Sequence, residues 1–563
     1  MNNWRLKTLK VFVFILAAII IGRLFYIQVI SGKFYQAQAL GQQAGFKEIQ
    51  GERGQVFLSN SRDSKGEADT DDTKSLAINQ DDWLAYAVSS QIQDKETFAD
   101  VLSKIIGGSK DSILSKMSQS DSYAIIEKNL SQSQVDSLKK LNLANLYFQD
   151  NPSRLYPQKN VASQVIGFLG GDGIGQYGIE GYYDSQLAGE SGIDEQLRGL
   201  NSINSSTDAS YLNGSDVYLT IDYNIQFEAE RLLQAAKKDV NIDSGQIIVM
   251  KPDTGKILAI AHYPSFDPNN YSAQRDFSIF QNSTTQKIFE PGSVFKPFTM
   301  AMGLQEGRIT PETTFVDTGS VTIGHDTAYN FDHKAYGLQD MSGILEKSIN
   351  VGAVWVEQKI PHQTFMDYVD KFGFTKKTGV TLQGEVSSQN QGLRNGSDFQ
   401  YVTASFGQGI EMTPLQLTSA FCMFANGGNL VKPYIVSKVV HGADEVNTQP
   451  QVQNVISSKT ASEVTTMLTN VVKRGFGTGA GIPGYYLAGK TGTAQVPYPD
   501  RKGYYPDRTI QSFVGFGPAL NPQFLILVKL DDPKVPESSL SAAPVFRKMA
   551  QYIIDYWQIS PDY

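Results

Sequence analysis

The chain has 563 residues, of which 41% are hydrophobic and 19% charged, so it is long enough for three or four folded units and too apolar to be disordered throughout. Its 49 basic and 57 acidic residues give a formal net charge of -8, which disfavours nucleic acid as a partner. The single cysteine, Cys422, excludes an internal disulfide and cysteine-based metal clusters, and the five histidines lack metal-ligand spacing. We therefore expect no metal site and no cofactor.

The N-terminus has the pattern of a membrane anchor. Residues 1–10 carry three basic side chains, and residues 11–30 are apolar except for Arg23 and Gln28. Twenty helical residues span the hydrocarbon core, and basic residues before the span hold that end in the cytoplasm. The alternative is a cleaved signal peptide, because the uninterrupted apolar stretch is only Val11–Gly22, but no convincing small-x-small cleavage site follows it. We predict a single-pass membrane protein with a cytoplasmic tail at 1–10 and an extracytoplasmic remainder.

Residues 31–215 show no pattern that carries chemistry. Residues 59–74 are acidic and poor in apolar side chains, as in a solvated loop, whereas residues 97–140 contain short amphipathic helical patterns. Residues 201–216 are rich in Ser, Asn and Gly, which is typical of a linker or a hairpin tip. We place the main domain boundary there, between 31–215 and 216–563.

The second part, 216–563, has an α+β pattern. A strand and a long helix come first, and a strand pair follows, joined by the turn at Asp253-Thr254-Gly255. A second strand pair and an amphipathic helix close the chain. The predicted elements are strands at 217–221, 245–252, 256–264, 512–519 and 523–532, with helices at 225–240 and 543–557. Strands at both ends of this region predict one sheet that the two ends close together.

Three short motifs stand in this region: Ser293-x-x-Lys296, Ser348-x-Asn350 and Lys490-Thr491-Gly492-Thr493. None is specific alone, since the chain also contains similar stretches in other contexts. These are Ser137/Lys140, Ser202/Asn204, Ser388/Asn390 and Lys377-Thr378-Gly379. Context separates the two sets, because Ser137 lies within a charged helical run and Lys377 within a loop-rich stretch.

Ser293 follows Pro-Gly and precedes an apolar helical run, which places it in the first turn of a buried helix. Lys296 is three positions further on, so the two side chains share a face. Without a histidine base, a neutral lysine can take the serine proton. Burial, the positive helix end and a second cation, for which Lys490 is the candidate, all lower a lysine pKa. Free N–H groups at the helix start can stabilise an oxyanion.

The other two motifs suit supporting roles. The hydroxyl of Ser348 can relay a proton to a leaving amine, and the amide of Asn350 can hold a substrate backbone. Read alone, Ser348-x-Asn350 indicates a helix N-cap instead. Lys490 to Thr493 reads as an accessible strand whose lysine and hydroxyls suit a carboxylate, while Gly492 allows close approach and the Thr493 N–H can complete an oxyanion hole.

The three motifs in this order resemble the signature of the penicillin-binding protein and serine β-lactamase superfamily. The gaps of 55 residues (293 to 348) and 140 residues (350 to 490) are more similar to those of transpeptidases than to those of compact β-lactamases. Further stretches resemble class B penicillin-binding proteins in both parts of the chain. They are 52–57, 154–170, 175–192, 245–271 and 406–428. Two features depart from the family, namely the acidic loop at 59–74 and the lack of any segment resembling a glycosyltransferase domain.

The resemblance implies a transpeptidase domain with an antiparallel sheet flanked by helices, after an elongated non-catalytic, dimerisation or pedestal-like module and one transmembrane helix. It implies peptidoglycan D,D-transpeptidation, in which Ser293 attacks the D-Ala-D-Ala bond of a stem peptide and an amine of a neighbouring stem resolves the acyl-enzyme. Lys490, Thr491 and Thr493 then hold the terminal carboxylate. The implied partners are stem peptides, β-lactams that acylate Ser293, the membrane, and a membrane-embedded glycosyltransferase.

Three alternatives stay open at this point. Within class B, a division role is weakly favoured over an elongation role by the 406–417 and 267–271 stretches. A hydrolytic carboxypeptidase or β-lactamase needs a water-activating group that we cannot identify by position. A non-catalytic sensor or scaffold is disfavoured, since sensors carry several spans and a scaffold is expected to lose a motif residue.

Overall fold

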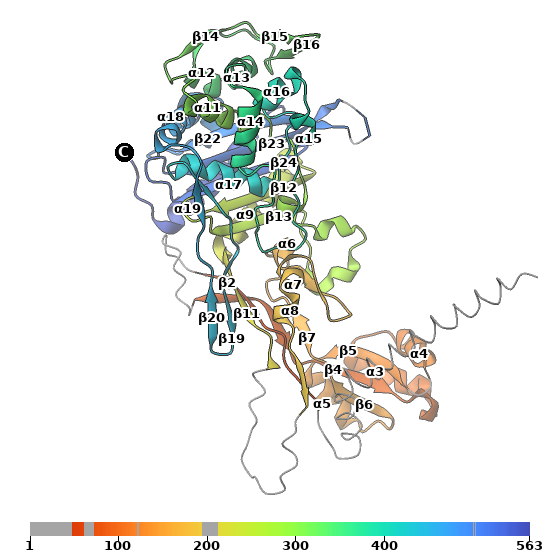
Figure 1. Ribbon diagram of the computed structural model, residues 1–563. Helices are drawn as coiled ribbons and strands as arrows, with labels where there is room; N and C mark the ends of the chain where they lie inside the picture. The colour runs from red at the N-terminus through yellow and green to blue at the C-terminus, as the bar shows by residue number, and fades with distance from the viewer. Residues whose placement is uncertain (1–47, 61–71, 121–122, 194–211, 499, 502) are drawn as a thin grey trace, which may run out of the picture. The chain divides into compact units, whose positions relative to one another are not determined.

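The computed structural model describes residues 48–60, 72–120, 123–193, 212–498, 500–501 and 503–563 (Figure 1). The chain forms two compact units, of which the smaller comprises Met1–Gly54, Ser185–Ser215 and His441–Asp444 and the larger the remainder. The predicted anchor at 11–30 lies outside the described residues. In the described part of the chain, no helix is long and apolar enough to cross a membrane.

In the smaller unit, β1 (Glu48–Gln50) pairs antiparallel with β10 (Ser191–Ile193). A six-stranded sheet has the strand order β20-β19-β11-β2-β3-β7. Its strands are β2 (Val56–Ser59), β3 (Thr73–Gln80), β7 (Ser153–Leu155), β11 (Asp216–Asp222), β19 (Val436–His441) and β20 (Asp444–Asn447). Because β11 pairs parallel with β2 and antiparallel with β19, this sheet hydrogen-bonds strands from both sides of residue 215.

Residues 83–150 build a small α/β layer with its own core. Its sheet, in the order β5-β4-β6, carries three helices, and the amphipathic helices predicted within 97–140 are confirmed. The elements are β4 (Trp83–Ala87), η2 (Ser89–Gln91), α3 (Lys95–Ile106), α4 (Lys110–Ser118), β5 (Ala124–Leu130), α5 (Gln132–Lys140) and β6 (Leu146–Asp150). Leu102 and Val135 are buried against the sheet, and a capping box of Ser131 and Gln134 begins α5.

Two groups of short elements lie at residues 163–187 and 268–286. Gln164 in the first group donates its amide to the backbone carbonyls of Pro264 and Ile279, both at 3.0 Å. The elements are α6 (Ser163–Ile166), β8 (Phe168–Leu169), β9 (Gly175–Gln176), α7 (Gly178–Tyr182), α8 (Asp184–Leu187), η5 (Pro268–Ala273), η6 (Phe277–Phe280) and α10 (Ser283–Gln286).

A separate sheet of the larger unit has five antiparallel strands in the order β13-β12-β24-β23-β22. They are β12 (Ser244–Met250), β13 (Ile257–Tyr263), β22 (Ala488–Pro497), β23 (Tyr504–Gly517) and β24 (Phe524–Asp531). Ile248 of β12 lies opposite Leu527 of β24, so segments far apart in sequence close one sheet. This confirms the α+β architecture predicted for this region.

The two faces of this sheet have different covers. One packs against α9 (Tyr223–Val240) and α19 (Ala542–Trp557), with Val528 and Phe546 in their shared core. The other carries Lys490 and packs against α17 (Pro414–Ala425), where Phe421 contacts Phe516. The side chains on the first face are apolar. They come from alternate residues of each strand, and the apolar sides of the two amphipathic helices pack on them.

A helical region lies over the second face (Figure 1). Its centre is Phe298 of α11 (Lys296–Gln305), which contacts the rings of Phe372, Phe374, Phe421 and Phe424. The other elements are β14 (Thr314–Asp317), β15 (Ser320–Ile323), β16 (Asp326–Tyr329), β17 (Gly337–Asp340), α12 (Met341–Glu346), α13 (Asn350–Glu357), α14 (His362–Lys371), α15 (Gln391–Arg394), α16 (Asp398–Ser405), β18 (Asn429–Val431), β21 (Val452–Asn454), α18 (Ser458–Arg474) and η8 (Thr478–Ala480). This packing fixes the start of α11 against the sheet.

Candidate active site

The predicted nucleophile lies in the tight turn η7 (Gly292–Phe295), immediately before α11. Gly292 has a φ of 61°, and its N–H donates to the carbonyl of Gly407 at 2.9 Å. A side chain at Gly407 would meet the Gly292 oxygen at 2.0 Å, and one at Gly492 would lie 2.9 Å from Val294. The backbone therefore approaches too closely for side chains here, which holds Ser293 beside strand β22.

Lys296 begins α11 and is 1% exposed. Its Nζ atom donates to the carbonyl of Ser348 at 2.5 Å and contacts the Ser348 hydroxyl at 3.2 Å. In the described part of the chain it pairs with no carboxylate. Burial, followed by the charge of Lys490, holds the pKa of Lys296 well below its usual value. An uncharged Lys296 keeps a lone pair with which to accept a proton.

Lys490 is fully buried on β22 and faces the same hydroxyl. Its Nζ atom donates to Ser348 Oγ at 3.0 Å and to the carbonyl and hydroxyl of Thr491 at 3.1 and 3.2 Å. Burial lowers the pKa of Lys490 to about 7. Near neutral pH this side chain therefore exists in both protonation states, which suits a group that passes protons on.

Ser348 connects the two lysines. It lies in the short loop between α12 and α13 with a φ of 53°, a conformation that non-glycine residues rarely adopt. Both its carbonyl and its hydroxyl contact Lys296, and its hydroxyl also contacts Lys490. The hydroxyl is thus a bridge along which a proton can move between the two amines.

The contact between Ser293 and Lys296 differs from the simple sequence prediction. The two residues lie on one helical turn as expected, but Lys296 is hydrogen-bonded to Ser348, and Ser293 Oγ has no hydrogen bond within the described residues. Ser293 is half-buried and lines a cleft of about 680 Å³. Its hydroxyl is therefore free to turn toward a substrate or toward Lys296.

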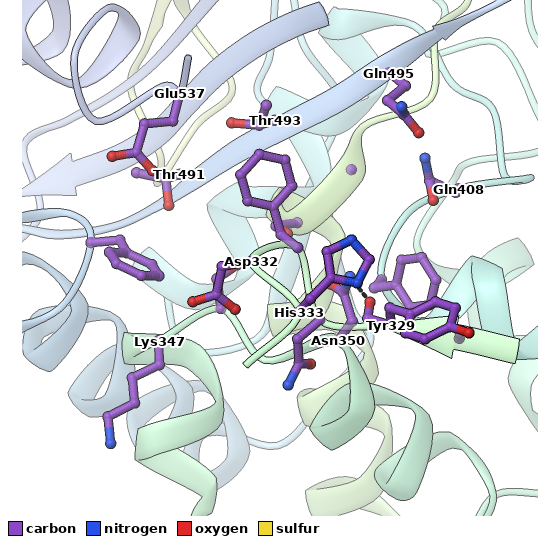
Figure 2. A pocket seen from close by; sticks show the side chains of 18 of the residues that line it. Tyr329, Asp332, His333, Lys347, Asn350, Gln408, Thr491, Thr493, Gln495 and Glu537 are labelled. Atoms are coloured by element: carbon purple, nitrogen blue, oxygen red, sulfur yellow. Dashed lines mark hydrogen bonds between the residues drawn. The ribbon is translucent and has the colours of Figure 1, made fainter. Parts of the chain in front are cut away.

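Asn350 is not used as a helix cap. Helix α13 begins at Asn350 itself, Ile349 occupies the cap position, and no side chain there caps the helix. The Asn350 amide donates to the carbonyl of Tyr329 at 2.9 Å and lines the cleft (Figure 2). The N-cap interpretation is therefore wrong.

Thr491 and Thr493 line the opposite side of the cleft (Figure 2). Thr493 Oγ1 accepts from the backbone N–H of Ser538 at 3.3 Å and lies 3.5 Å from its hydroxyl. Together with the buried Lys490, these hydroxyls provide donors for an anionic group.

Sequence reasoning missed several residues that line the cleft. They are Tyr329, Asp332, His333, Gln408, Gln495, Glu537 and Ser538. Asp332 accepts from the Tyr336 hydroxyl at 2.8 Å and lies 3.4 Å from the ammonium group of Lys334, so its charge is compensated locally. None of these residues belongs to the three short motifs, although Gln408 lies in the 406–428 stretch, and only the fold brings them together.

The similar stretches elsewhere have structural roles. Ser137 lies within α5 and bonds the carbonyl of Ser133 at 2.8 Å. Ser388 donates to Glu411 at 3.1 Å, and Asn390 accepts from the backbone N–H of the same residue at 2.8 Å. Ser202 and Asn204 lie outside the described residues.

The chain matches two protein families. Residues 245–551 match the penicillin-binding protein transpeptidase domain, and residues 49–219 match the penicillin-binding protein dimerisation domain. It is 29% identical over 542 residues to stage V sporulation protein D of Bacillus subtilis, covering 94% of this chain and 82% of that protein. It is also 31% identical over 458 residues to peptidoglycan D,D-transpeptidase FtsI of Buchnera aphidicola, covering 79% and 77%.

Solved structures agree with the sequence relatives. The crystal structure of penicillin-binding protein 3 from Mycobacterium tuberculosis in complex with aztreonam superimposes with a TM-score of 0.70 at 25% identity, covering 92% of this chain and 98% of that one. Penicillin-binding protein 2X from Streptococcus thermophilus shares the fold, with a TM-score of 0.73. The chain therefore belongs to the penicillin-binding protein family, as a class B peptidoglycan D,D-transpeptidase.

Proposed function

We propose that Ser293 is the nucleophile of this transpeptidase, with Lys296 as its base. The observation that carries the proposal is the buried amine of Lys296, which has no carboxylate partner in the described part of the chain and a pKa held well below its usual value. Because an uncharged amine is required to take a serine proton, this arrangement supports acyl transfer without a histidine.

In the acylation step, the Ser293 proton passes to Lys296 as its oxygen bonds to the carbonyl carbon of the penultimate D-Ala. The peptide C–N bond then breaks. The departing amine receives a proton through Ser348, whose hydroxyl lies 3.2 Å from Lys296 and 3.0 Å from Lys490. The terminal D-Ala leaves, and the stem peptide remains as an ester on Ser293.

The second step reverses this path. An amine of a neighbouring stem peptide attacks the ester carbonyl, gives its proton back through the same amines, and releases the Ser293 hydroxyl. The backbone N–H groups of Ser293 and Thr493 stabilise the oxyanion in both steps. Asn350 holds the donor backbone, while Thr491, Thr493 and Lys490 hold its terminal carboxylate, and Gly492 leaves room for the chain.

We also propose a place for the protein in the cell. Residues 11–30 anchor it with the tail 1–10 in the cytoplasm, residues 31–215 form the non-catalytic module, and residues 216–563 form the transpeptidase domain outside the membrane. A membrane-embedded glycosyltransferase supplies the glycan strands. The 406–417 and 267–271 stretches favour the division septum over the side wall.

Labelling with a fluorescent penicillin tests the nucleophile. Ser293→Ala removes the oxygen that forms the ester, so we expect covalent labelling to disappear. Ser137→Ala is the matched control, because Ser137 also stands three residues before a lysine but lies on the exposed face of α5. Labelling that persists in Ser293→Ala would overturn the assignment.

Imaging of a fluorescent fusion tests the cellular role. A band at midcell supports division, and an even distribution along the side wall contradicts it in favour of elongation.

A further inference from the structure

A cavity away from the cleft at Ser293 is lined by three lysines. It has a volume of about 370 Å³, and we call it the lysine cavity. The three side chains are those of Lys376, Lys377 and Lys432, and all three residues are exposed. The lysine cavity and the cleft have no lining residue in common. It is therefore separate from the acyl-transfer site.

Two segments form the walls of the lysine cavity. The loop after α14 carries Lys376 and Lys377, whereas Lys432 follows the last residue of β18, which pairs with β21. A Cβ atom on Gly379 would lie 3.2 Å from Cε and 3.7 Å from Nζ of Lys432. The ammonium group of Lys432 thus reaches the loop that carries the other two lysines, so the three positive charges gather around one cavity.

Helix α17 holds both walls in place. The amide of Gln416, which is 2% exposed, donates to the carbonyls of Gly373 and Lys376 at 3.1 and 2.7 Å. The hydroxyl of Ser419, which is 4% exposed, donates to the carbonyl of Val431 at 2.5 Å. Because both walls are bonded to one buried helix, the cavity is formed before any ligand arrives, which lowers the cost of binding.

The positive charges of the lysine cavity have no acidic partner. Among the residues that the structure describes, none of the three lysines forms an ion pair and no Asp or Glu lines the cavity. The carboxylate of Glu385 lies behind the loop, where it is 8% exposed and accepts from the N–H groups of Thr378 and Gly379. One negative charge against three lysines leaves an excess of two positive charges. An anion is therefore favoured here, although the whole chain has a net charge of -8.

The donors of the lysine cavity suit a phosphate group. An exposed lysine ammonium is a compact charge with three hydrogen-bond donors, and it binds phosphate as a point charge. The side-chain amides of Gln451 and Gln453 also line the cavity and have no hydrogen bond within the described residues. They add uncharged donors beside the ammonium groups. A phosphate has several oxygens, so it can accept from all of these donors at once.

We propose that the lysine cavity binds a phosphate group, either as the free ion or as the end of a phosphate ester. The ammonium groups of Lys376, Lys377 and Lys432 donate to the phosphate oxygens, and the amides of Gln451 and Gln453 donate to those that remain. No covalent bond forms or breaks there. This site is additional to the acyl-transfer cleft and does not depend on the proposed roles of the cleft residues.

The 31P resonance of the ligand, measured with the full chain in phosphate-free buffer, tests the proposal. At constant ionic strength, inorganic phosphate and glycerol 3-phosphate are each expected to shift or broaden in a saturable way, with a Kd of roughly millimolar or tighter. Tighter binding of glycerol 3-phosphate identifies an ester as the ligand, and equal binding identifies the phosphate group alone. If neither compound shows a saturable change, the proposal is wrong.

Charge-matched variants locate the binding. Lys376→Gln/Lys432→Gln removes two of the three ammonium groups and is expected to weaken phosphate binding about tenfold or more. Lys238→Gln/Lys371→Gln is the control, because it removes the same charge from exposed residues that do not line the cavity. Circular dichroism confirms that each variant is folded. The single variant Lys432→Gln, with an expected loss of about two- to fivefold, serves if the first double variant is not folded. Equal losses in the two double variants, or no loss in a folded cavity variant, overturn the proposal.

Discussion

The chain contains two Lys-Thr-Gly stretches with different surroundings. Lys490 is fully buried on β22 and contacts the Ser348 hydroxyl at 3.0 Å. Lys377, in the loop between α14 and α15, is exposed. There, the N–H groups of Thr378 and Gly379 donate to the carboxylate of Glu385 at 2.7 and 3.0 Å. One stretch places a desolvated amine against Ser348, which lines the cleft, whereas the other closes a turn.

The difference shows that burial rather than residue type gives this tripeptide its chemistry. A lysine exposed to water stays charged at neutral pH, since the ammonium is well hydrated. The same side chain on a buried strand loses that hydration, and its pKa falls to about 7 for Lys490. In the other stretch, the carboxylate of Glu385 accepts from the N–H groups of Thr378 and Gly379, so these donors are not available to a ligand.

The largest effect is expected when the lysine of each Lys-Thr-Gly stretch is replaced in turn. Lys490→Ala removes one end of the proton path, so we expect the rate of penicillin acylation to fall by about 10²–10⁴-fold. Lys377→Ala is expected to leave the rate unchanged. Stopped-flow measurement of acylation compares the two. Equal losses in both variants would contradict the separation of the two stretches.

The second largest effect on acylation is expected from the Ser348 hydroxyl, which lies between Lys296 and Lys490. Ser348→Ala keeps the carbonyl that accepts from Lys296 but removes the hydroxyl between the amines, so acylation is expected to slow by about 10²-fold. Ser388→Ala, in the other Ser-x-Asn stretch, is the matched control. The same stopped-flow assay measures both, and a Ser348→Ala rate close to that of the parent would rule out the relay.

The lowered pKa of Lys490 also predicts how stability depends on pH. Between about pH 7 and its usual value of 10.5, the unfolded chain binds a proton that the folded chain does not, so stability rises with pH through this window. This increase in the free energy of unfolding is on the order of a few kcal/mol, and we expect it to be absent in the Lys490→Met variant. Denaturant midpoints at about pH 7 and pH 9.5 measure it. The Lys377→Met control should keep the increase in unfolding free energy with pH. If the parent protein shows no such increase, the prediction is wrong.

The smallest effect concerns the structural stretch. Glu385→Ala leaves the N–H groups of Thr378 and Gly379 without their acceptor, so we expect a loss of about 1–3 kcal/mol in unfolding free energy. Acylation of Ser293 is expected to stay at the parent rate. Chemical denaturation and penicillin labelling of one preparation measure both quantities, and a large loss of labelling in a folded variant would connect this loop to the cleft.

Much of the fold could be predicted because it follows local patterns. The strand at 217–221 and the helix at 225–240 correspond to β11 and α9, since alternation and helical spacing of apolar residues are written in the chain itself. Asp332 and Glu537 could not be predicted as parts of the cleft. Their local sequence does not indicate which other strands or loops they lie next to in the folded chain.

The sequence by itself determined the family and the order of the three motifs, and it predicted Ser293 as the nucleophile, because these depend on residue types at fixed spacing. The tertiary structure decided which hydrogen bonds the lysines make and how strongly they are desolvated. It gave Lys296 the carbonyl and hydroxyl of Ser348 as partners, and it set a left-handed Ser348 between the two amines. Such contacts join residues more than 50 positions apart, so only the packed chain can specify them.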